Sequence, residues 1–232
     1  MGIINWISDQ FYITFIEHNR YQLFVNGFLN TILIAAGALF IGFVVGTLVA
    51  IVRVYHAQTG KWKIGSGLCG AYLAAFRGTP VVVQLMIIYY IVFSGFDNPV
   101  LVATIAFGIN SGAYVAEIVR AGILAVDIGQ TEAGRSLGLP TGKTMKLIVL
   151  PQAIKNILPA LGNECVTLLK ETSVAGYIPV KDLAKAGENI RTLTAEPYFS
   201  LLFIAFVYFV LVYGLTVFLK RLERRLRKGD RG

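Results

Sequence analysis

The chain has 232 residues, of which 56% are hydrophobic and only 15% are charged, with a formal net charge of +8. A soluble domain of this size would carry about 25% charged residues, so the composition argues against an ordinary water-soluble protein and indicates lipid as the solvent. The cations cluster between apolar blocks and near the C-terminal end, which is typical of membrane topology signals and not of a nucleic-acid-binding face.

Five apolar blocks are long enough to cross a bilayer, which takes about 20 residues. In chain order they are residues 22–52, 64–96, 99–116, 156–179 and 197–219. Residues 1–20 lack the basic start, apolar core and cleavage site of a signal peptide, so we expect the first block to direct its own insertion. The predicted fold is an all-α membrane protein with five transmembrane helices.

Five spans place the two termini on opposite sides of the membrane. If the N-terminus is outside, the outside segments hold only four cations: Arg20, Lys181, Lys185 and Arg191. The inside segments then hold the cations near residues 53–63, those of residues 120–155 and the basic run from Lys220 onwards. Because cations favour the cytoplasmic side, we predict an extracytoplasmic N-terminus and a cytoplasmic C-terminus.

The second block is too long for one straight crossing at about 1.5 Å per residue, and Arg77-Gly78-Thr79-Pro80 interrupts it near its middle. A helix broken at mid-membrane frees backbone groups and helix ends for a polar substrate. The alternative is a simple proline kink, in which case Arg77 is a structural cation or part of a gate.

The segment from Ala121 to Ile154 is too long for a simple turn, and glycine and proline residues break it at Gly138, Pro140, Gly142 and Pro151. Residues 130–137 favour a short helix that ends at Gly138, a residue suited to a left-handed C-cap. The small residues Ala133 and Gly134 would let another surface approach, and Leu137 and Leu139 would anchor it in an apolar groove. The alternative is an amphipathic surface helix without a partner.

Charged residues are costly inside a span and usually line a cavity or form pairs. The fourth block carries Glu164, Lys170 and Glu171, and the two acids lie seven residues apart, on one helix face. They would hold the ammonium group of an amino acid, while Lys170 or Arg77 would meet its carboxylate. Two acids favour a cationic substrate. The alternative is an internal ion-pair network.

One set of spacings points to a known family. Glu132-Ala133-Gly134, three residues, Gly138, nine residues, Ile148, one residue and Leu150-Pro151 resembles the cytoplasmic signature of the inner-membrane permeases of bacterial ABC importers. Only Gly134 departs from it, since the family has a second alanine there. Over about residues 22–225 the chain further resembles the polar amino-acid permeases of histidine, glutamine and arginine type. The segments that carry this likeness are Arg77-Gly78-Thr79-Pro80 with Gln84, residues 113–123, Leu150-Pro151-Gln152-Ala153 and Lys170-Glu171-Thr172-Ser173.

The resemblance implies the type I ABC importer permease fold with a cytoplasmic coupling helix, over a permease domain of residues 22–225. An N-terminal extracytoplasmic segment (residues 1–21) and a cytoplasmic tail (residues 226–232) would flank this domain. It implies a bacterial inner-membrane importer of polar amino acids with three partners: an ATP-binding subunit, a second permease that is identical or homologous, and an extracytoplasmic amino-acid-binding protein. The coupling helix would place Glu132, Ala133, Gly134, Leu137, Gly138 and Leu139 against the ATPase. The substrate site would involve Thr79, Pro80, Gln84, Glu164, Lys170 and Glu171.

Three alternatives stay open at this point: an ion-coupled secondary amino-acid transporter, a membrane enzyme and a non-transporting sensor subunit. The chain is expected to have no catalytic residue, because its glycine patterns at residues 65–70, 134–138 and 138–144 follow no predicted strand. His18 and His56 are isolated, and Cys69 and Cys165 lie within apolar blocks, so no metal site is expected. ATP and Mg²⁺ would bind the partner ATPase alone.

Overall fold

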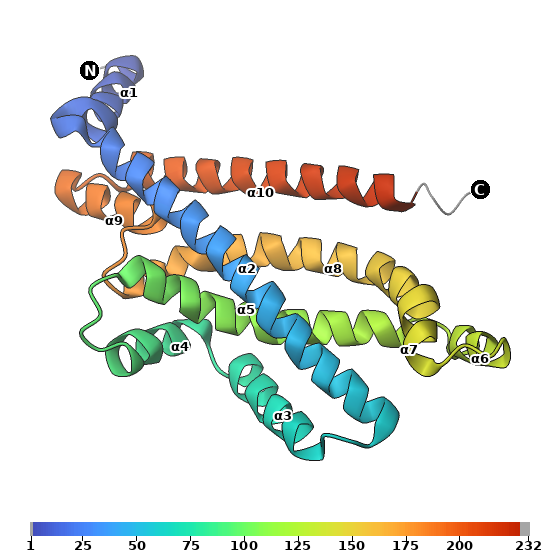
Figure 1. Ribbon diagram of the computed structural model, residues 1–232. Helices are drawn as coiled ribbons and strands as arrows, with labels where there is room; N and C mark the ends of the chain where they lie inside the picture. Colours follow the sequence, from blue (N-terminus) through green and yellow to red (C-terminus); the bar gives the residue numbers. More distant parts are fainter. Residues whose placement is uncertain (1, 228–232) are drawn as a thin grey trace. The chain divides into compact units, whose positions relative to one another are not determined.

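The computed structural model describes residues 2–227, and within this range all regular secondary structure is helical, as the sequence predicts (Figure 1). The α-helices are α1 (Ile3–Phe11), α2 (Tyr21–Thr59), α3 (Lys63–Gly78), α4 (Val81–Ile87), α5 (Pro99–Leu124), α6 (Ile128–Ser136), α7 (Thr141–Thr144), α8 (Leu150–Glu171), α9 (Leu183–Thr194) and α10 (Pro197–Arg227). Short π-helical or 3-10 segments cover Tyr12–Ile16, Glu17–Asn19, Ile88–Val92, Met145–Val149 and Thr172–Tyr177. Of the predicted tail, residues 228–232 lie outside the described residues.

Three of these helices are long and apolar enough to cross a membrane, namely α2, α5 and α10. The pair formed by α3 and the helical run 81–92 makes a fourth candidate if it counts as one broken span. These four positions agree with the first, second, third and fifth predicted blocks. The fifth crossing falls to α8, which is less apolar because it carries Lys155, Glu164, Lys170 and Glu171, and its crossing stays a prediction.

The bounds predicted for the fourth block were wrong by several residues. We expected a span over residues 156–179 after a break at Pro151, whereas α8 begins at Leu150 and ends at Glu171. Pro151 lies within a run that is helical from Thr141 to Glu171, directly after the π-helical turn Met145–Val149, so it does not end the helix. Gly142 likewise lies inside α7, so the chain is helical from Thr141 onwards and its breaks are confined to residues 137–140.

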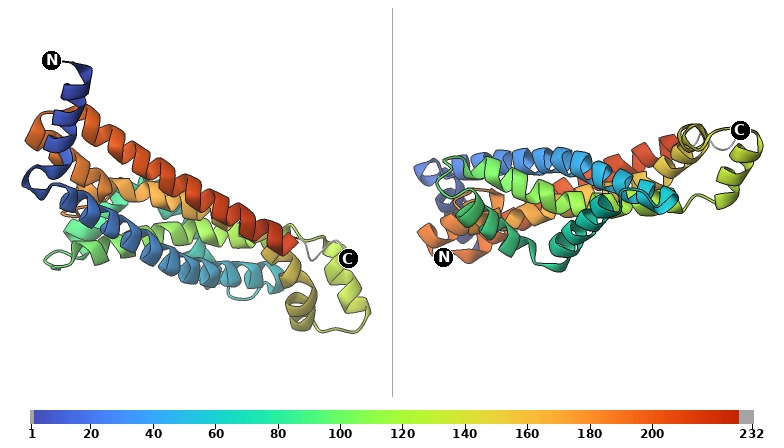
Figure 2. Two further views of the ribbon diagram at one scale, coloured as in Figure 1. Left: turned by 90° about the horizontal axis from the view of Figure 1, so that it is seen from above. Right: turned by 60° about the horizontal axis from the view of Figure 1, so that its bottom comes forward.

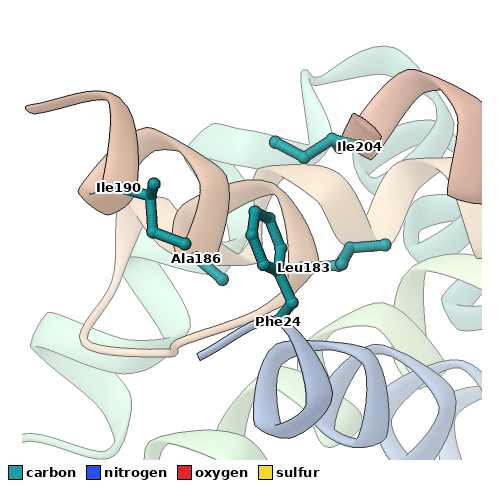
Figure 3. Close-up of a cluster of buried hydrophobic side chains, with 5 residues drawn as sticks. All are labelled: Phe24, Leu183, Ala186, Ile190 and Ile204. Carbon is teal, nitrogen blue, oxygen red and sulfur yellow. The ribbon is translucent and has the colours of Figure 1, made fainter. Parts of the chain in front are cut away.

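The chain divides into two compact units, and the first comprises residues 1–38, 81–107 and 167–214. Its core cluster consists of Phe24, Leu183, Ala186, Ile190 and Ile204, which come from α2, α9 and α10 (Figure 3). Fully burying side chains of this size contributes about 1.5–3 kcal/mol each. The short helix α9, which the sequence analysis did not predict, is therefore held by its apolar face.

The first half of α2 forms hydrogen bonds with the segment that leads into α9. The side-chain amide of Asn30 donates to the carbonyl oxygen of Lys181 (2.9 Å), and the Leu183 amide donates to the Thr31 hydroxyl (3.0 Å). Gly27 allows this approach, since a Cβ atom there would lie only 2.7 Å from the Asp182 carbonyl oxygen. The α9 segment is thus fixed to α2 by backbone as well as side-chain contacts.

The N-terminal helix α1, also unpredicted, packs against the beginning of α10 (Figure 2). The ring of Trp6 meets that of Phe199 edge to face at 5.9 Å, and Phe15 meets Phe203 at 4.8 Å. Such aromatic pairs contribute about 0.5–1.5 kcal/mol beyond their buried area. Residues 2–21 are therefore a folded part of the first unit.

The second unit comprises residues 39–80, 108–166 and 215–232. Glycines bring α2 and α5 into close contact there: a Cβ atom at Gly46 would lie 2.7 Å from the Gly112 carbonyl oxygen, and one at Gly42 would lie 3.0 Å from Ser111. The small residues Gly42, Gly46 and Gly112 thus let the two helices approach closely. Ala50, Val115, Val119, Ala153 and Ile157 form a core cluster of this unit.

Many large apolar side chains remain exposed on the long helices. On α10, Leu202, Phe206 and Phe209 are each more than 60% exposed, and Phe40 on α2 is 71% exposed. In water such exposed apolar faces would make the protein prone to aggregation, whereas lipid or a partner helix removes them from water. The exposed faces therefore agree with a membrane-embedded chain.

Candidate functional site

The short helix α6 is tightly capped at both ends. The Asp127 carboxylate accepts a hydrogen bond from the Gly129 amide (2.7 Å) at its start. At its end Gly138 has a φ angle of 81°, its amide donates to the Arg135 carbonyl oxygen, and the Leu139 amide donates to the Gly134 carbonyl oxygen. This pair of bonds is the Schellman arrangement, which favours glycine at the left-handed position. The predicted short helix with a glycine cap is confirmed.

Gly134 has a different role from the one we expected. It is the buried residue of α6, and a Cβ atom there would lie 2.6 Å from Cγ2 of Thr144 and 2.9 Å from Cδ1 of Ile148. The expectation that Gly134 opens the helix to an external surface was therefore wrong. The missing side chain instead lets α6 pack on α7 and on the π-helical turn that follows.

The other expected docking residues lie mostly on the surface. Leu137 is 82% exposed, Leu139 is half-buried, and Glu132, Ala133 and Gly138 are exposed. The Gln152 side chain donates to Oε1 of Gln130 (3.2 Å) and so ties α6 to the start of α8. A rigid short helix thus presents a large apolar side chain at its C-terminal end, which has no structural use within the chain.

The break predicted in the second block is present at Thr79 and Pro80. α3 ends at Gly78, and Thr79 has an extended backbone (φ −124°, ψ 150°). The Thr79 hydroxyl donates to the Ala75 carbonyl oxygen (2.8 Å), and the Asn110 amide donates to that of Phe76 (3.3 Å). Side chains therefore satisfy two of the carbonyl groups that the end of α3 leaves without a helical partner.

Glu164 is buried in the second unit, where it is 9% exposed and its Oε1 accepts a hydrogen bond from the Ser111 hydroxyl (2.7 Å). It lines a cavity of about 410 Å³ together with Arg77, Tyr114, Glu117 and Asn156. A carboxylate and a guanidinium group therefore border one cavity next to the residues at which α3 ends. Such a pair of opposite charges suits the two ends of a zwitterion.

The remaining expected substrate residues, Gln84, Lys170 and Glu171, belong to the first unit. Gln84 is buried on α4, Glu171 is half-buried at the end of α8, and Lys170 is exposed. α4 packs against the 3-10 turn of residues 172–177, which directly follows Glu171. Within this unit, Gln84 and Glu171 are therefore brought into one neighbourhood.

Sequence reasoning missed a charged group in the second unit. Glu117 and Arg120 on α5 form an ion pair through two of the three guanidinium nitrogens, Nε and Nη2, with an Nε–Oε2 distance of 3.0 Å. The Arg77 guanidinium lies over the ring of Tyr114, 5.7 Å from its centre. The ion pair could have been predicted from the sequence, because Glu117 and Arg120 are three residues apart on one helix. The contact between Arg77 and Tyr114 could not, because it joins two different helices.

Outside the membrane-spanning segments, two carboxyl groups on or next to α9 have shifted pKa values. Asp182 is fully buried and accepts hydrogen bonds from the amides of Ala184 (3.0 Å) and Lys185 (3.2 Å). Burial raises the pKa of Asp182 to about 6, in spite of these bonds. The hydrogen bond from the Lys185 ammonium lowers the pKa of the exposed Glu188.

Within residues 2–227 the structure holds no group of three or more His, Cys, Asp or Glu side chains arranged to bind a metal ion. Cys69 and Cys165 are free thiols. The functional candidates are thus the α6 surface and the polar residues around the α3 break.

Comparison with known proteins gives these features a context. Residues 57–228 match the family described as the binding-protein-dependent transport system inner membrane component. The chain is 37% identical to the arginine transport system permease protein ArtQ of Bacillus subtilis (strain 168), over 89% of this chain and 93% of that protein. It is 34% identical to the glutamine transport system permease protein GlnP of Escherichia coli (strain K12), over 88% and 93% of the two chains.

Solved structures agree. A crystal structure of an amino acid ABC transporter with histidines matches with a TM-score of 0.82 and 37% identity, over 91% of this chain and 98% of that one. An inward-facing structure of the MetNI methionine ABC transporter matches with a TM-score of 0.75 over 88% and 96% of the two chains. At 21% identity, that second match shows the fold alone.

Proposed function

The chain belongs to the family of binding-protein-dependent transport system inner membrane components, and we propose that it moves a polar amino acid, preferably a cationic one, past the break at Thr79 and Pro80. It is a membrane-embedded permease subunit of an amino-acid ABC transporter and not an enzyme, and ATP is hydrolysed by a separate subunit. These relatives support the importer and not an ion-coupled secondary transporter.

The substrate pathway rests on one observation: Glu164 and Arg77 line the same cavity of about 410 Å³ at the end of α3. A carboxylate holds an ammonium group, and a guanidinium group matches a carboxylate through two parallel hydrogen bonds. We also propose Lys170 and Glu171 on α8 as a second pair of charges for the substrate, and Thr79, Pro80 and Gln84 as further substrate-binding residues. Two acids leave one carboxylate for a cationic side chain, and the arginine permease of B. subtilis is among the relatives that fit this preference.

The α6 surface is the proposed contact with the ATP-binding subunit that the family implies. Its support is the Schellman cap at Gly138, which fixes Leu137 in an exposed position after a helix tied to α8 through Gln130 and Gln152. Motion of the ATPase would pass through this rigid element to α8. Glu132, Ala133 and Leu139 complete the proposed contact, whereas the buried Gly134 supports it from inside.

A matched pair of substitutions tests this contact. Leu137 and Ile128 are both exposed, at 82% and 75%, and their spacing of nine residues puts them on opposite sides of α6. Leu137→Asp should prevent copurification with the ATP-binding subunit, while Ile128→Asp should leave it unchanged. Equal recovery of the ATPase with both variants would refute the proposed surface.

The family implies an extracytoplasmic binding protein in addition to the ATPase. We further propose a second permease subunit, identical or homologous, because the apolar faces of the long helices are exposed and one such chain is too small to enclose a pathway. The excess of cations in the segments around α6 and at the C-terminal end of α10 supports an extracytoplasmic N-terminus and a cytoplasmic C-terminus.

A further inference from the structure

Three arginines from three helices of the second unit surround another cavity, of about 540 Å³. They are Arg53 on α2, Arg77 near the end of α3 and Arg120 on α5, and Gly78 at the helix break also lines this space. We call this cavity the arginine vestibule. Arg77, Tyr114 and Glu117 border it and also border the cavity that contains Glu164, so the two spaces share a wall.

The charges of the vestibule do not balance. Glu117 is its acidic residue, and it already forms hydrogen bonds with Nε and Nη2 of Arg120. The ring of Tyr114 orients Arg77 but does not neutralise it. Among the described residues, neither Arg53 nor Arg77 forms a salt bridge. Two positive charges are therefore left over around the cavity.

These charges follow the helix axis from one end of α5 toward the break. Arg120 lies four residues, or about 6 Å along the helix, before the end of α5 at Leu124. Tyr114, whose ring lies under the Arg77 guanidinium, is ten residues, or about 15 Å, before that end. The end of α5 leads into α6, so this is the side of the ATPase in the proposed function. Uncompensated cations at this depth of a span mark a path for an ion or a polar ligand.

We propose that the arginine vestibule is a carboxylate-binding exit site, which takes up the α-carboxylate of the transported amino acid after it leaves Glu164 and before it reaches the cytoplasm. The proposal rests on the proposed function. The planar guanidinium group of Arg53 offers paired N–H donors that match the two oxygens of a carboxylate. A phosphate oxygen of an anionic lipid has the same chemistry, and the experiment separates the two sources.

The test uses the assembled transporter in vesicles. ATP is supplied outside, so that only complexes with outward-facing ATPases work, and the binding protein with L-arginine, L-histidine or L-glutamine is enclosed inside. The same amino acid, or its α-carboxamide, is then added outside as an inhibitor of ATP-driven efflux from the vesicle. The carboxamide keeps the size and the ammonium group but has no carboxylate.

For the wild type, the amino acid should inhibit at a concentration about tenfold below that of its carboxamide, as expected for one charged hydrogen-bond partner. Arg53→Gln should erase this difference and leave the KM for the enclosed substrate unchanged. Arg53→Lys keeps the positive charge but not the paired N–H donors of the guanidinium group, so it should retain part of the difference between the amino acid and its carboxamide. Lys61→Gln removes a cation from an exposed position beyond α2 and serves as the control, with inhibition as in the wild type.

Other outcomes contradict the proposal in distinct ways. If the amino acid and its carboxamide inhibit the wild type equally, the arginine vestibule does not bind the carboxylate, and the proposal is refuted. If Arg53→Gln changes activity only in vesicles that contain phosphatidylglycerol and not in phosphatidylcholine vesicles, its ligand is a lipid phosphate and the exit site is refuted. If no amino acid is transported by the wild type, the proposed function itself fails.

Discussion

The hydroxyl group of Ser111 on α5 donates a hydrogen bond of 2.7 Å to Oε1 of Glu164 on α8. This contact joins two helices of the second unit at the wall of the cavity that also contains Arg77. A carboxylate has about four acceptor positions, so one serine hydroxyl satisfies part of it and leaves capacity for a ligand. Glu164 thus has both an internal partner and a place at the cavity.

Replacing Glu164 separates these two roles. Glu164→Gln removes the charge with little change of shape, and uptake of cationic amino acids should fall through a KM raised about ten- to a hundredfold, or roughly 1–3 kcal/mol. Neutral amino acids should be affected less. Ser111→Ala is the control, because it removes the internal partner but keeps the carboxylate at the cavity. Unchanged kinetics for every amino acid in the Glu164→Gln variant would show that Glu164 serves only the helix contact.

The buried Gly134 predicts a compensating pair of substitutions. Gly134→Ala restores the alanine that is usual in the family signature, but its Cβ atom would lie 2.6 Å from Cγ2 of Thr144, so the protein should lose roughly 1 kcal/mol of stability despite the better helix propensity. Adding Thr144→Ser removes that methyl group and keeps the hydroxyl, so the double variant should regain part of the lost Tm in detergent, since Cδ1 of Ile148 would still lie 2.9 Å from the new Cβ atom. An equal deficit in the single and double variants would argue against this steric cause.

Asp182 predicts a pH dependence for the docking of α9. Burial raises its folded-state pKa from 3.8 to about 6, so the folded state keeps a proton that the unfolded segment releases above about pH 4. The docked α9 is therefore most stable below pH 4, and it loses stability as the pH rises through 6, by roughly 3 kcal/mol in total at 1.36 kcal/mol per pKa unit.

Hydrogen exchange of the α9 amides, corrected for the intrinsic rate, measures this change. Protection factors should be higher at pH 5 than at pH 8 in the wild type. The amides of Ala184 and Lys185 bond different oxygens of Asp182, so Asp182→Asn keeps an acceptor for only one of them and lowers the overall protection. Because asparagine cannot titrate, this lower protection should be the same at both pH values. A wild-type segment that is better protected at pH 8 would reverse the predicted sign.

The proposed orientation predicts which side of the membrane each end occupies. With Cys69 and Cys165 replaced by serine, an impermeant thiol reagent added to intact cells should modify a cysteine at Asp9, which is exposed on α1. It should modify a cysteine at Asp230 only after the cells are opened. The opposite labelling pattern would invert the topology.

Much of the fold was predictable because hydropathy is a property of single segments. The apolar blocks at residues 22–52, 99–116 and 197–219 fall within α2, α5 and α10, and Arg77-Gly78-Thr79-Pro80 marks the end of α3. Helices α1 and α9 were missed because they are short and their apolar faces are defined only by the partners they pack on. Pro151 was taken for a break, although the helical run continues through it after the π-helical turn Met145–Val149.

The candidate site was predictable only in part for a similar reason. The cap at Gly138 follows from local backbone chemistry, so its conformation could be expected from the sequence. The vestibule around Arg53, Arg77 and Arg120 depends on which faces of α2, α3 and α5 meet, and that arrangement follows from the glycine contacts at Gly42, Gly46 and Gly112. A short sequence motif therefore does not predict the arrangement of these three arginines.

Coupling of the permease to its ATPase through the α6 helix is tested most directly by the substrate-stimulated ATPase activity of the assembled transporter. Gly138→Val places a β-branched residue at a φ angle of 81°, which costs roughly 1–2 kcal/mol and displaces Leu137 and Leu139, whereas Gly138→Asn tolerates this conformation. We predict that the valine variant still binds the loaded binding protein but that its ATPase activity no longer responds to substrate, while the asparagine variant responds like the wild type. Normal stimulation in the Gly138→Val transporter would contradict the account.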